Sequence, residues 1–492
     1  MMKKILFAAL SLLTYTASAQ LGVKYDPTVQ STESMQYFKP KGDLFVGDCI
    51  PFDRNGTYYY YWLLDSAHHK SLNGLGGHQW ALSTSTDLKT WKHEPVVLGI
   101  DEEWEKSICT GSVVYHKGNY YAFYATRLIN KQGEVNEQLS YAISKDGIHF
   151  KKQKPNPFYT SAPGYSKRNF RDPKVFVDDK GEFHLFVSSD QENPVLAMIS
   201  GCLVHLSSKD LKNWTVHEPI ITGQPSTPEC PDYFFWKGWY YLVYSDNSNT
   251  YYVKSRKPYG PWEEPRYQAL NEDWSNVVKT AGFKNDRRIA AAWVPNRAEN
   301  KDYQHEIFGG NSLFREVIQE LDGTLNTRFP AEMIPATGTA IAIKPEMMYK
   351  AKAEGGSIVL ADEGGVASAR IVDVPQNCRI SLEVEPLGMN EEFGLILKSD
   401  EKGRNGYRLN VSANNSTVSL GNTTIQGVSG LQKPITIDVV MKDGILDADI
   451  DHRRTIVNRT YEHNGSVLWL YAKHGTVRVK NIVIQPLATS NN

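Results

Sequence analysis

The chain has few cysteines, no excess of charge of either sign and no long internal hydrophobic run. Its five cysteines are spread over 492 residues without a paired spacing, which argues against a disulfide framework and excludes a zinc site of the close Cys-x-x-Cys kind. Lys and Arg number 54 against 55 Asp and Glu, so nothing indicates electrostatic capture of nucleic acid or of another polyanion. A neutral ligand fits this charge balance better.

Sustained helical periodicity is also missing. No stretch from residue 20 to about residue 334 repeats apolar residues at a period of 3.6, which disfavours a helical domain. Beyond the N-terminus no apolar run approaches the about 20 residues that span a bilayer. At the N-terminus Lys3 and Lys4 precede a short apolar run and the triplet Ala17-Ser18-Ala19, the pattern of a secretory signal peptide over residues 1–19. We therefore expect an exported protein, secreted or periplasmic, with no membrane span.

A composite strand pattern recurs five times along the first two thirds of the chain. Each copy begins with a turn, continues as a strand that alternates aromatic and small residues, and leads to a second strand and a polar turn. The copies start as GTYYYYWLLD, GNYYAFYATR, GEFHLFVSSD, GWYYLVYSD and the weaker DRRIAAAWV, at Gly56, Gly118, Gly181, Gly238 and Asp286. A four-stranded unit of this kind cannot cover both of its faces alone, and radial stacking about an axis covers them. The repeats therefore favour a five-bladed β-propeller over residues 20–337, rather than a sandwich alone, because sandwich strands do not repeat a long pattern in this way.

From about residue 340 the pattern changes to short alternating strands separated by turns, such as RISLEVEPL and SVLWLYA. This is typical of a β-sandwich, which we place at residues 338–492. It contains no cluster of acid, base and nucleophile, so any catalysis is expected in the propeller. The predicted fold class is all-β, a five-bladed β-propeller followed by a C-terminal β-sandwich.

Three blades carry an acidic residue on the strand expected to line the central channel. Asp48, Asp172 and Glu229 lie eight or nine residues before the glycine that opens the next strand, so their carboxylates should converge at one end of the channel. Burying a carboxylate beside an apolar strand costs free energy unless it has a partner or a task. Two carboxylates that flank a glycosidic bond are the usual apparatus for its hydrolysis, and crowding of like charges raises the pKa of one of them.

Further residues are candidates for contact with a sugar. The aromatic content of 11%, with 27 Tyr and 11 Trp, supplies flat faces for sugar rings, although strands favour these residues in any case. Arg171 either pairs with a carboxylate or donates to a sugar hydroxyl, provided that a bulge turns it to the same face as its neighbour Asp172. The candidates for substrate binding are Arg171, Trp80, Thr110, Cys109, Gln79 and Trp293. For Trp80 and Trp293 the alternative is packing between blades, and for Thr110 it is an ordinary place in a strand.

Histidines close in sequence raise the question of a metal. His68, His69 and His78 lack the i, i+4 spacing of a helical metal pair, so we expect no metal and no cofactor. Asp65 and Gln79 are candidates for the same pocket.

At these residues the chain resembles glycoside hydrolase family 32, the β-fructosidases of the invertase, inulinase and levanase type. Two signature motifs match at Arg171-Asp172-Pro173 and Glu229-Cys230, and CTGSVV from Cys109 and HQWALSTSTDLKTW from His78 resemble two more. The resemblance runs from about residue 46 to residue 333. The first motif of the family, Asn-Asp-Pro-Asn-Gly, is here Gly47-Asp48-Cys49-Ile50-Pro51, so the Asn that contacts fructose in the family is absent.

The resemblance implies a role for each acid. Asp48 is then the nucleophile, Asp172 holds sugar hydroxyls and stabilises the transition state, and Glu229 is the acid/base of a retaining hydrolase. Its substrates would be terminal fructosyl or related furanosyl linkages in oligo- or polysaccharides. Two alternatives stay open: an inverting arabinofuranosidase or xylosidase of the related five-bladed family 43, and a non-catalytic carbohydrate-binding propeller. The sequence does not indicate whether the protein is a monomer or an oligomer.

Overall fold

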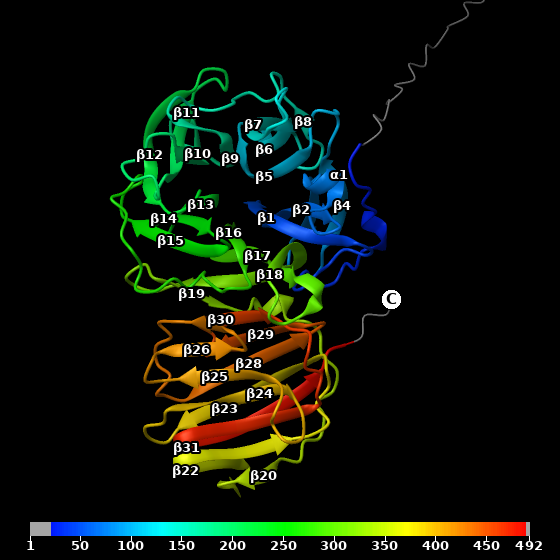
Figure 1. Cartoon of the computed structure of the whole chain (residues 1–492), viewed down its shortest axis with the longest axis vertical. Helices are drawn as coiled ribbons and strands as arrows, with labels where there is room; N and C mark the ends of the chain where they lie inside the picture. The colour runs from blue at the N-terminus through cyan, green and yellow to red at the C-terminus, as the bar shows by residue number, and fades with distance from the viewer. Residues whose placement is uncertain (1–20, 489–492) are drawn as a thin grey trace, which may run out of the picture.

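The computed structural model describes residues 21–488, which form almost exclusively β-strands (Figure 1). The expected signal peptide lies outside the described residues. Sheets arranged around an axis form a β-propeller, and a second unit packs against it as a β-sandwich, which confirms the predicted fold class. All five cysteines are buried and free. Within residues 21–488 no helix is long and apolar enough to cross a membrane.

Each blade contributes one inner strand beside the propeller axis. These strands are β1 (Leu44–Arg54), β5 (Ser107–His116), β9 (Tyr165–Val177), β13 (Glu229–Trp236) and β16 (Asn276–Phe283). The outer strands follow in blade order as β2 (Thr57–Ser66), β3 (Gln79–Ser85) and β4 (Lys92–Leu98); β6 (Asn119–Ile129), β7 (Val135–Ser144) and β8 (Lys151–Lys152); β10 (Phe183–Gln191), β11 (Gly201–Ser208) and β12 (Thr215–Gln224); β14 (Trp239–Asp246) and β15 (Asn249–Ser255); and β17 (Arg287–Arg297), β18 (Glu306–Gln319) and β19 (Leu325–Arg328). The short helical segments are η1 (Pro27–Val29), α1 (Ser71–Gly74), η2 (Ala298–Asn300) and η3 (Ala331–Met333).

Strand β2 shows why the aromatic-rich repeat forms a blade. Successive side chains of a strand point to opposite faces of the sheet, and both faces of this sheet are covered by other parts of the propeller. Tyr60 packs on Phe314 of β18 with ring centres 4.8 Å apart, whereas Tyr61, on the other face, packs on Phe150 of the second blade at 6.1 Å. A propeller strand therefore requires bulky apolar residues at nearly every position, which the segment TYYYYWLLD provides.

The first and last blades are joined by hydrogen bonds that close the ring. Val46 of β1 pairs with Gly310 of β18, and the segment before β1 adds two backbone bonds of 2.9 Å, from Tyr37 to Ser312 and from Ser312 to Phe38. The closure covers edges that would otherwise be open to pairing with another chain.

All five inner strands carry a β-bulge at a corresponding place. The pairing register shifts at residues 46–49, 108–111, 171–174, 229–232 and 276–279. A bulge sets two residues against one on the neighbouring strand, bends the strand and changes the direction of its side chains. The three acids expected at the channel all lie at these bulges.

The C-terminal sandwich begins after a connection that contains residue 337, the expected boundary. Its strands are β20 (Glu346–Tyr349), β21 (Ala351–Glu354), β22 (Ser357–Ile371), β23 (Cys378–Pro386), β24 (Glu392–Ser399), β25 (Tyr407–Ser412), β26 (Thr417–Leu420), β27 (Thr423–Ile425), β28 (Ile435–Lys442), β29 (Ile445–Ile450), β30 (Arg454–Arg459) and β31 (Val467–Pro486). The long strand β31 pairs with β22, β23 and β24 and so joins the parts of the sandwich. Strands β29 and β30 face the propeller (Figure 1).

A buried ionic cluster connects the two domains. Arg315 of β18 donates to Glu272 of the propeller at 2.9 and 3.0 Å and to Asp447 of β29 at 2.7 and 2.8 Å. Tyr37 donates a further bond of 2.7 Å to Asp447. The side chains of the three charged residues are at most 4% exposed, so each charge depends on the others for compensation.

Replacing Arg315 with Met is expected to lower the free energy of unfolding by about 3–5 kcal/mol, because Glu272 and Asp447 would remain buried without their partner. Urea unfolding followed by fluorescence measures the effect. The matched control is Arg404→Met, which removes an exposed pair with Asp400 and should cost about 0–1 kcal/mol. Equal effects of the two substitutions would show that the buried cluster does not stabilise the contact between the domains.

Candidate active site

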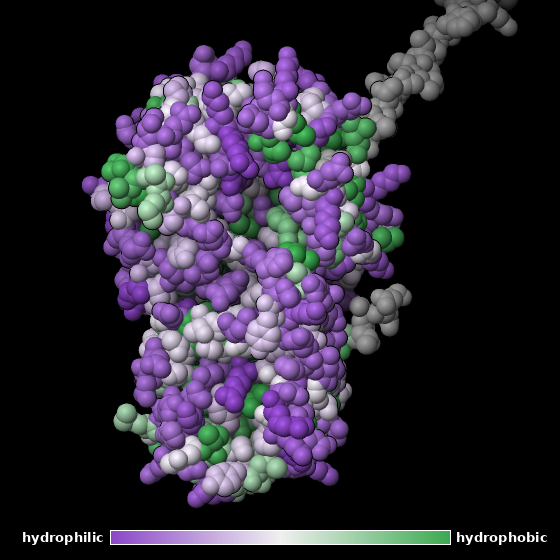
Figure 2. Space-filling model, in the orientation of Figure 1, coloured by the Kyte–Doolittle hydropathy of each residue, from purple (hydrophilic) through white to green (hydrophobic). Residues whose placement is uncertain are grey.

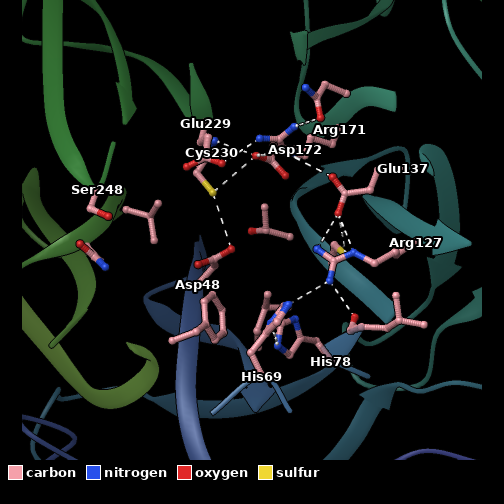
Figure 3. A pocket seen from close by; sticks show the side chains of 18 of the residues that line it. Asp48, His69, His78, Arg127, Glu137, Arg171, Asp172, Glu229, Cys230 and Ser248 are labelled. Atoms are coloured by element: carbon pink, nitrogen blue, oxygen red, sulfur yellow. Dashed lines mark hydrogen bonds and ion pairs between the residues drawn. The ribbon is translucent and has the colours of Figure 1, made fainter. Parts of the chain in front are cut away.

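A cavity of about 590 Å³ opens at the propeller axis, next to the bulges of the inner strands. Asp48, Asp172 and Glu229 all line it, and Figure 3 shows their side chains directed into the same space. Figure 2 shows a hollow near the middle of the propeller, with hydrophilic and hydrophobic residues around it. The convergence expected from the matching offsets is therefore present in the structure.

The bulge in β9 determines how Arg171 and Asp172 are oriented. Asp172 has φ of 53°, a left-handed conformation that is uncommon for a residue other than glycine. Because this conformation breaks the alternation of the strand, both side chains line the cavity. Cys230 in β13 has φ of 51°, and it lines the cavity together with its neighbour Glu229. The bulges thus allow each strand to present two consecutive side chains to the same space.

Short contacts connect the three acids. The thiol of Cys230 lies 3.8 Å from Oδ2 of Asp48 and 3.7 Å from Oδ2 of Asp172, and the Cys230 backbone N–H donates to Asp172 at 3.1 Å. Arg171 contacts Asp172 at 3.6 Å and donates to Glu229 at 2.8 Å. All three carboxylates therefore lie around one thiol and one guanidinium group.

Burial and mutual repulsion favour the neutral forms of these acids. Burial, with smaller contributions from Asp172 and Glu229, raises the pKa of Asp48 to about 7, while the positive charge of Lys279 opposes the shift. Burial also raises the pKa of Asp172 and of Glu229, against the lowering effect of Arg171. Asp172 is 4% exposed, whereas 40% of the Glu229 side chain is open to the cavity. Carboxylates with pKa values shifted upwards in a cavity are typical of acid–base catalysis.

Arg171 pairs with carboxylates, one of the two roles expected for it. Besides Glu229 and Asp172 it contacts Glu137 of β7 at 3.4 Å. Glu137 in turn accepts two bonds, of 2.8 and 3.0 Å, from Arg127 of β6. Although burial favours the neutral acid, Arg171 and Arg127 hold the pKa of Glu137 below its ordinary value. A fourth, ionised carboxylate therefore holds Arg171 beside the other acids.

Sequence reasoning missed Glu137, Arg127 and Lys279. Arg127 and Glu137 lie on outer strands and face each other through the pairing of β6 with β7. Lys279, at the bulge of β16, donates to the backbone oxygen of Gly111 at 3.0 Å and contacts Thr110 at 3.3 Å. For Arg127 and Lys279 the available signal was a charged residue within a largely apolar strand, since such residues are rarely buried without a partner. Glu137 lies between Asn136 and Gln138 and gave no such signal.

The candidates for substrate binding divide into two groups. Cys109, Thr110 and Trp293 line the cavity with Arg171. Trp80 and Gln79 do not, so the prediction for these two residues was wrong. Both are on β3, which β2 separates from the inner strand β1, and are fully buried. The Trp80 indole donates to the backbone of Cys109 at 2.9 Å.

Gln79 is used in local packing near the N-terminal segment. Its side chain donates to the backbone of Val23 at 2.8 Å and accepts from the backbone of Ile100 at 3.2 Å. Asp65 is likewise fully buried, with the backbone of His69 donating to it at 2.9 Å, and it does not line the cavity. Asp65 pairs with Phe45 of the inner strand β1, but its side chain is enclosed by contacts with His69 and His78.

Asp65, His69 and His78 form a cluster with the spacing of a metal site. Nε2 of His78 lies 3.2 Å from Nδ1 of His69 and 3.1 Å from Oδ1 of Asp65. However, Arg127 lies 3.2 Å from Nε2 of His69, and a guanidinium group can only donate. Burial lowers the pKa of His69 to about 4, so the neutral ring carries its single proton on Nδ1, the atom that would have to bind a metal. The arrangement fits a hydrogen-bonded cluster beside the cavity better than a metal centre.

Comparison with known proteins identifies the family. Residues 49–327 match the N-terminal domain of glycosyl hydrolases family 32. The chain is 27% identical over 312 residues to a levanbiose-producing levanase of Geobacillus stearothermophilus, covering 56% of this chain and 73% of the relative. It is 25% identical over 284 residues to a sucrose-6-phosphate hydrolase of Escherichia coli, covering 53% and 57%. The chain thus spans little more than half of the latter protein.

Solved structures extend the similarity to the sandwich. Fructan 1-exohydrolase IIa from Cichorium intybus superimposes with a TM-score of 0.70 at 15% identity, over 93% of this chain and 98% of that one. Exo-inulinase from Aspergillus awamori gives 0.68 at 14% identity, over 94% and 100%. At these identities the likeness concerns the fold alone. Because the match of residues 49–327 covers more than half of the sequence, the chain belongs to glycosyl hydrolases family 32.

Proposed function

We propose that the protein is a retaining, β-fructofuranosidase-like glycoside hydrolase that releases terminal fructosyl or related furanosyl residues from oligo- or polysaccharides. The observation that carries this proposal is the meeting of Asp48, Asp172 and Glu229 on one cavity. Relatives named as levanase and sucrose-6-phosphate hydrolase support a fructosyl substrate.

In the first step an oxygen of Asp48 attacks the anomeric carbon of the sugar. The bond from this carbon to the leaving group breaks, its electron pair stays on the leaving oxygen, and Glu229 gives that oxygen a proton. Water then gives a proton to Glu229 and attacks the same carbon. The ester bond to Asp48 breaks, and the carboxylate is regenerated with the anomeric configuration retained.

Arg171 and Asp172 control the charge during these steps. Glu229 must be protonated to act as an acid, yet its contact with Arg171 at 2.8 Å favours the ionised form. Glu137 and Asp172 compete for the same guanidinium group, which weakens its hold on Glu229. Asp172 is placed beside Asp48 through Cys230, where its carboxylate can hold sugar hydroxyls and stabilise developing positive charge.

The test is hydrolysis of sucrose, inulin and levan, beside aryl arabinofuranoside and aryl xyloside. Fructose release is expected, and with added methanol a retaining enzyme also forms methyl β-fructofuranoside from its covalent intermediate. Release of arabinose or xylose alone would replace the proposal by the family 43 type of activity. Binding of sugar without turnover would indicate a carbohydrate-binding propeller.

The pH profile tests the role of Lys279. The nucleophile must be ionised, so kcat/KM should fall as the pH drops below about 7, the pKa of Asp48 in the folded protein. The positive charge of Lys279 lowers this pKa, so Lys279→Met is expected to move the acidic limb to higher pH by about one unit or more. Lys279→Arg keeps the charge and is the matched control. An acidic limb that stays in place in the Met variant would contradict the role of Lys279.

We further propose that the protein is exported. The pattern over residues 1–19 supports this. N-terminal sequencing of the mature protein, expected to begin at Gln20, tests the proposal, and a retained Met1 would oppose it.

A further inference from the structure

Gly47, immediately before Asp48, is required by the ring of Phe308. A Cβ atom at position 47 would lie 2.7 Å from Cε1 and 2.9 Å from Cζ of Phe308, closer than non-bonded carbon atoms approach. The backbone of Gly47 does not have a positive φ, so its conformation does not demand glycine. Space is the reason: the aromatic ring occupies the volume that a side chain at position 47 would take.

Phe308 is held in this place by other rings. It stacks on His78 with ring centres 4.8 Å apart and an angle of 21°, and it packs against Trp293 at 4.9 Å and against His69 at 5.2 Å. All four of these residues line the cavity. Phe308 is half-buried, so the same ring that fills the space beside Gly47 offers apolar surface to a ligand.

A buried polar atom without a partner among the described residues lies near this apolar surface. Asn276 is 5% exposed and lines the cavity, and its side-chain oxygen accepts no hydrogen bond within residues 21–488. Its amide group donates to Glu306 at 3.4 Å, and Asn276 pairs with Trp293 across the strands. A buried acceptor without a donor costs free energy, which a sugar hydroxyl bound here would recover.

We propose that Gly47 and Phe308 form an apolar floor of the subsite beside Asp48, selecting a furanosyl residue that turns a C–H face toward the ring. Asn276 then accepts a hydrogen bond from a hydroxyl of the same sugar. This inference rests on the proposed function only for the identity of the sugar.

The experiment uses the full chain with two substitutions at Phe308. Phe308→Leu keeps an apolar side chain but removes the aromatic face, and Phe308→Ala removes most of the volume. The Kd of fructose by calorimetry and KM for the substrate hydrolysed by the wild type are both expected to rise by about 5- to 10-fold in the Leu variant. Phe235→Ala, which removes an exposed ring on β13, is the control and should leave both values unchanged.

A double-mutant cycle tests the steric part of the inference. Gly47→Asn alone is expected to lower Tm and to weaken fructose binding, because its side chain collides with Phe308. The double variant with Gly47→Asn and Phe308→Ala should have a Tm at least as high as that of Phe308→Ala alone, because the Asn side chain enters the space that the ring has left. Additive losses of Tm, or a Gly47→Asn variant as stable as the wild type, would overturn the steric claim.

Failure of this inference can be distinguished from failure of the proposed function. If the wild type hydrolyses fructosides and Phe308→Leu keeps the wild-type KM and Kd, the apolar floor is contradicted. The proposed hydrolase function is then unaffected. If the wild type shows no turnover but binds fructose, and Phe308→Leu binds fructose more weakly, the hydrolase function is contradicted and the apolar floor is supported.

Discussion

Asp48→Asn is expected to lower kcat by at least about 10⁴-fold, because the variant lacks the oxygen that forms the covalent intermediate. Asn has nearly the same shape, so the cavity and its contacts should persist. The measurement is fructose release at high enzyme concentration, together with methanol trapping, which should yield no methyl fructoside.

Stability provides an independent readout of the same variant. Burial raises the pKa of Asp48 from 3.8 to about 7, so the folded protein holds this proton more tightly than the unfolded chain does. The contribution of Asp48 to stability therefore decreases as the pH rises from about 4 to about 7. Asn does not ionise, so the variant does not lose this stability as the pH rises. The Tm difference between the variant and the wild type should therefore be larger, in favour of the variant, at pH 8 than at pH 5.

The matched control is Asp53→Asn on the same strand. Asp53 is half-buried with a raised pKa caused first by burial, but it does not line the cavity. This variant should retain wild-type kcat. Loss of activity in both variants would point to damage of β1 rather than to a nucleophile, and full activity of Asp48→Asn would exclude the proposed mechanism.

Glu229→Gln is the second substitution with a large expected effect, a loss of kcat by about 10²–10⁴-fold. The amide cannot give a proton to the leaving oxygen. The loss should therefore be large for sucrose and small for an aryl fructoside, whose leaving group needs less protonation. The basic limb of the pH profile, which reports deprotonation of the acid, should disappear.

Glu263→Gln in the same blade serves as the control, because its side chain is 54% exposed and far in sequence from the bulge. It should behave as the wild type with both substrates. If the kcat of Glu229→Gln fell by the same factor with sucrose and with the aryl fructoside, Glu229 would bind or position the sugar without acting as the acid.

The repeats and the equal offsets made the propeller and the meeting of three acids predictable. A strand of a repeating blade holds the same position relative to the axis in each copy, so residues at equal offsets must lie at similar depth. The same regularity explains why Trp80 and Gln79 were wrongly included. They belong to a motif that matched in sequence, but they lie on β3, which β2 separates from the inner strand β1.

The contacts that Arg127, Glu137 and Lys279 make around the site could not be predicted from the sequence. Arg127 and Glu137 meet through strand pairing, and Lys279 reaches the strand of another blade. No fixed spacing in the sequence encodes such contacts. The bulges were likewise unpredictable, because a bulge depends on how two strands pair rather than on the residues of one strand.

By itself the sequence determined the all-β architecture, the five repeats, and the identity and depth of Asp48, Asp172 and Glu229, because these depend on local periodicity and on symmetry. Only the tertiary structure decided that Arg171 and Asp172 face the same cavity, that Glu137 holds Arg171, and that Phe308 takes the space beside Gly47. Those features arise from backbone irregularities and from contacts between blades. There, residues distant in sequence fill the same space or pair with the same charged group.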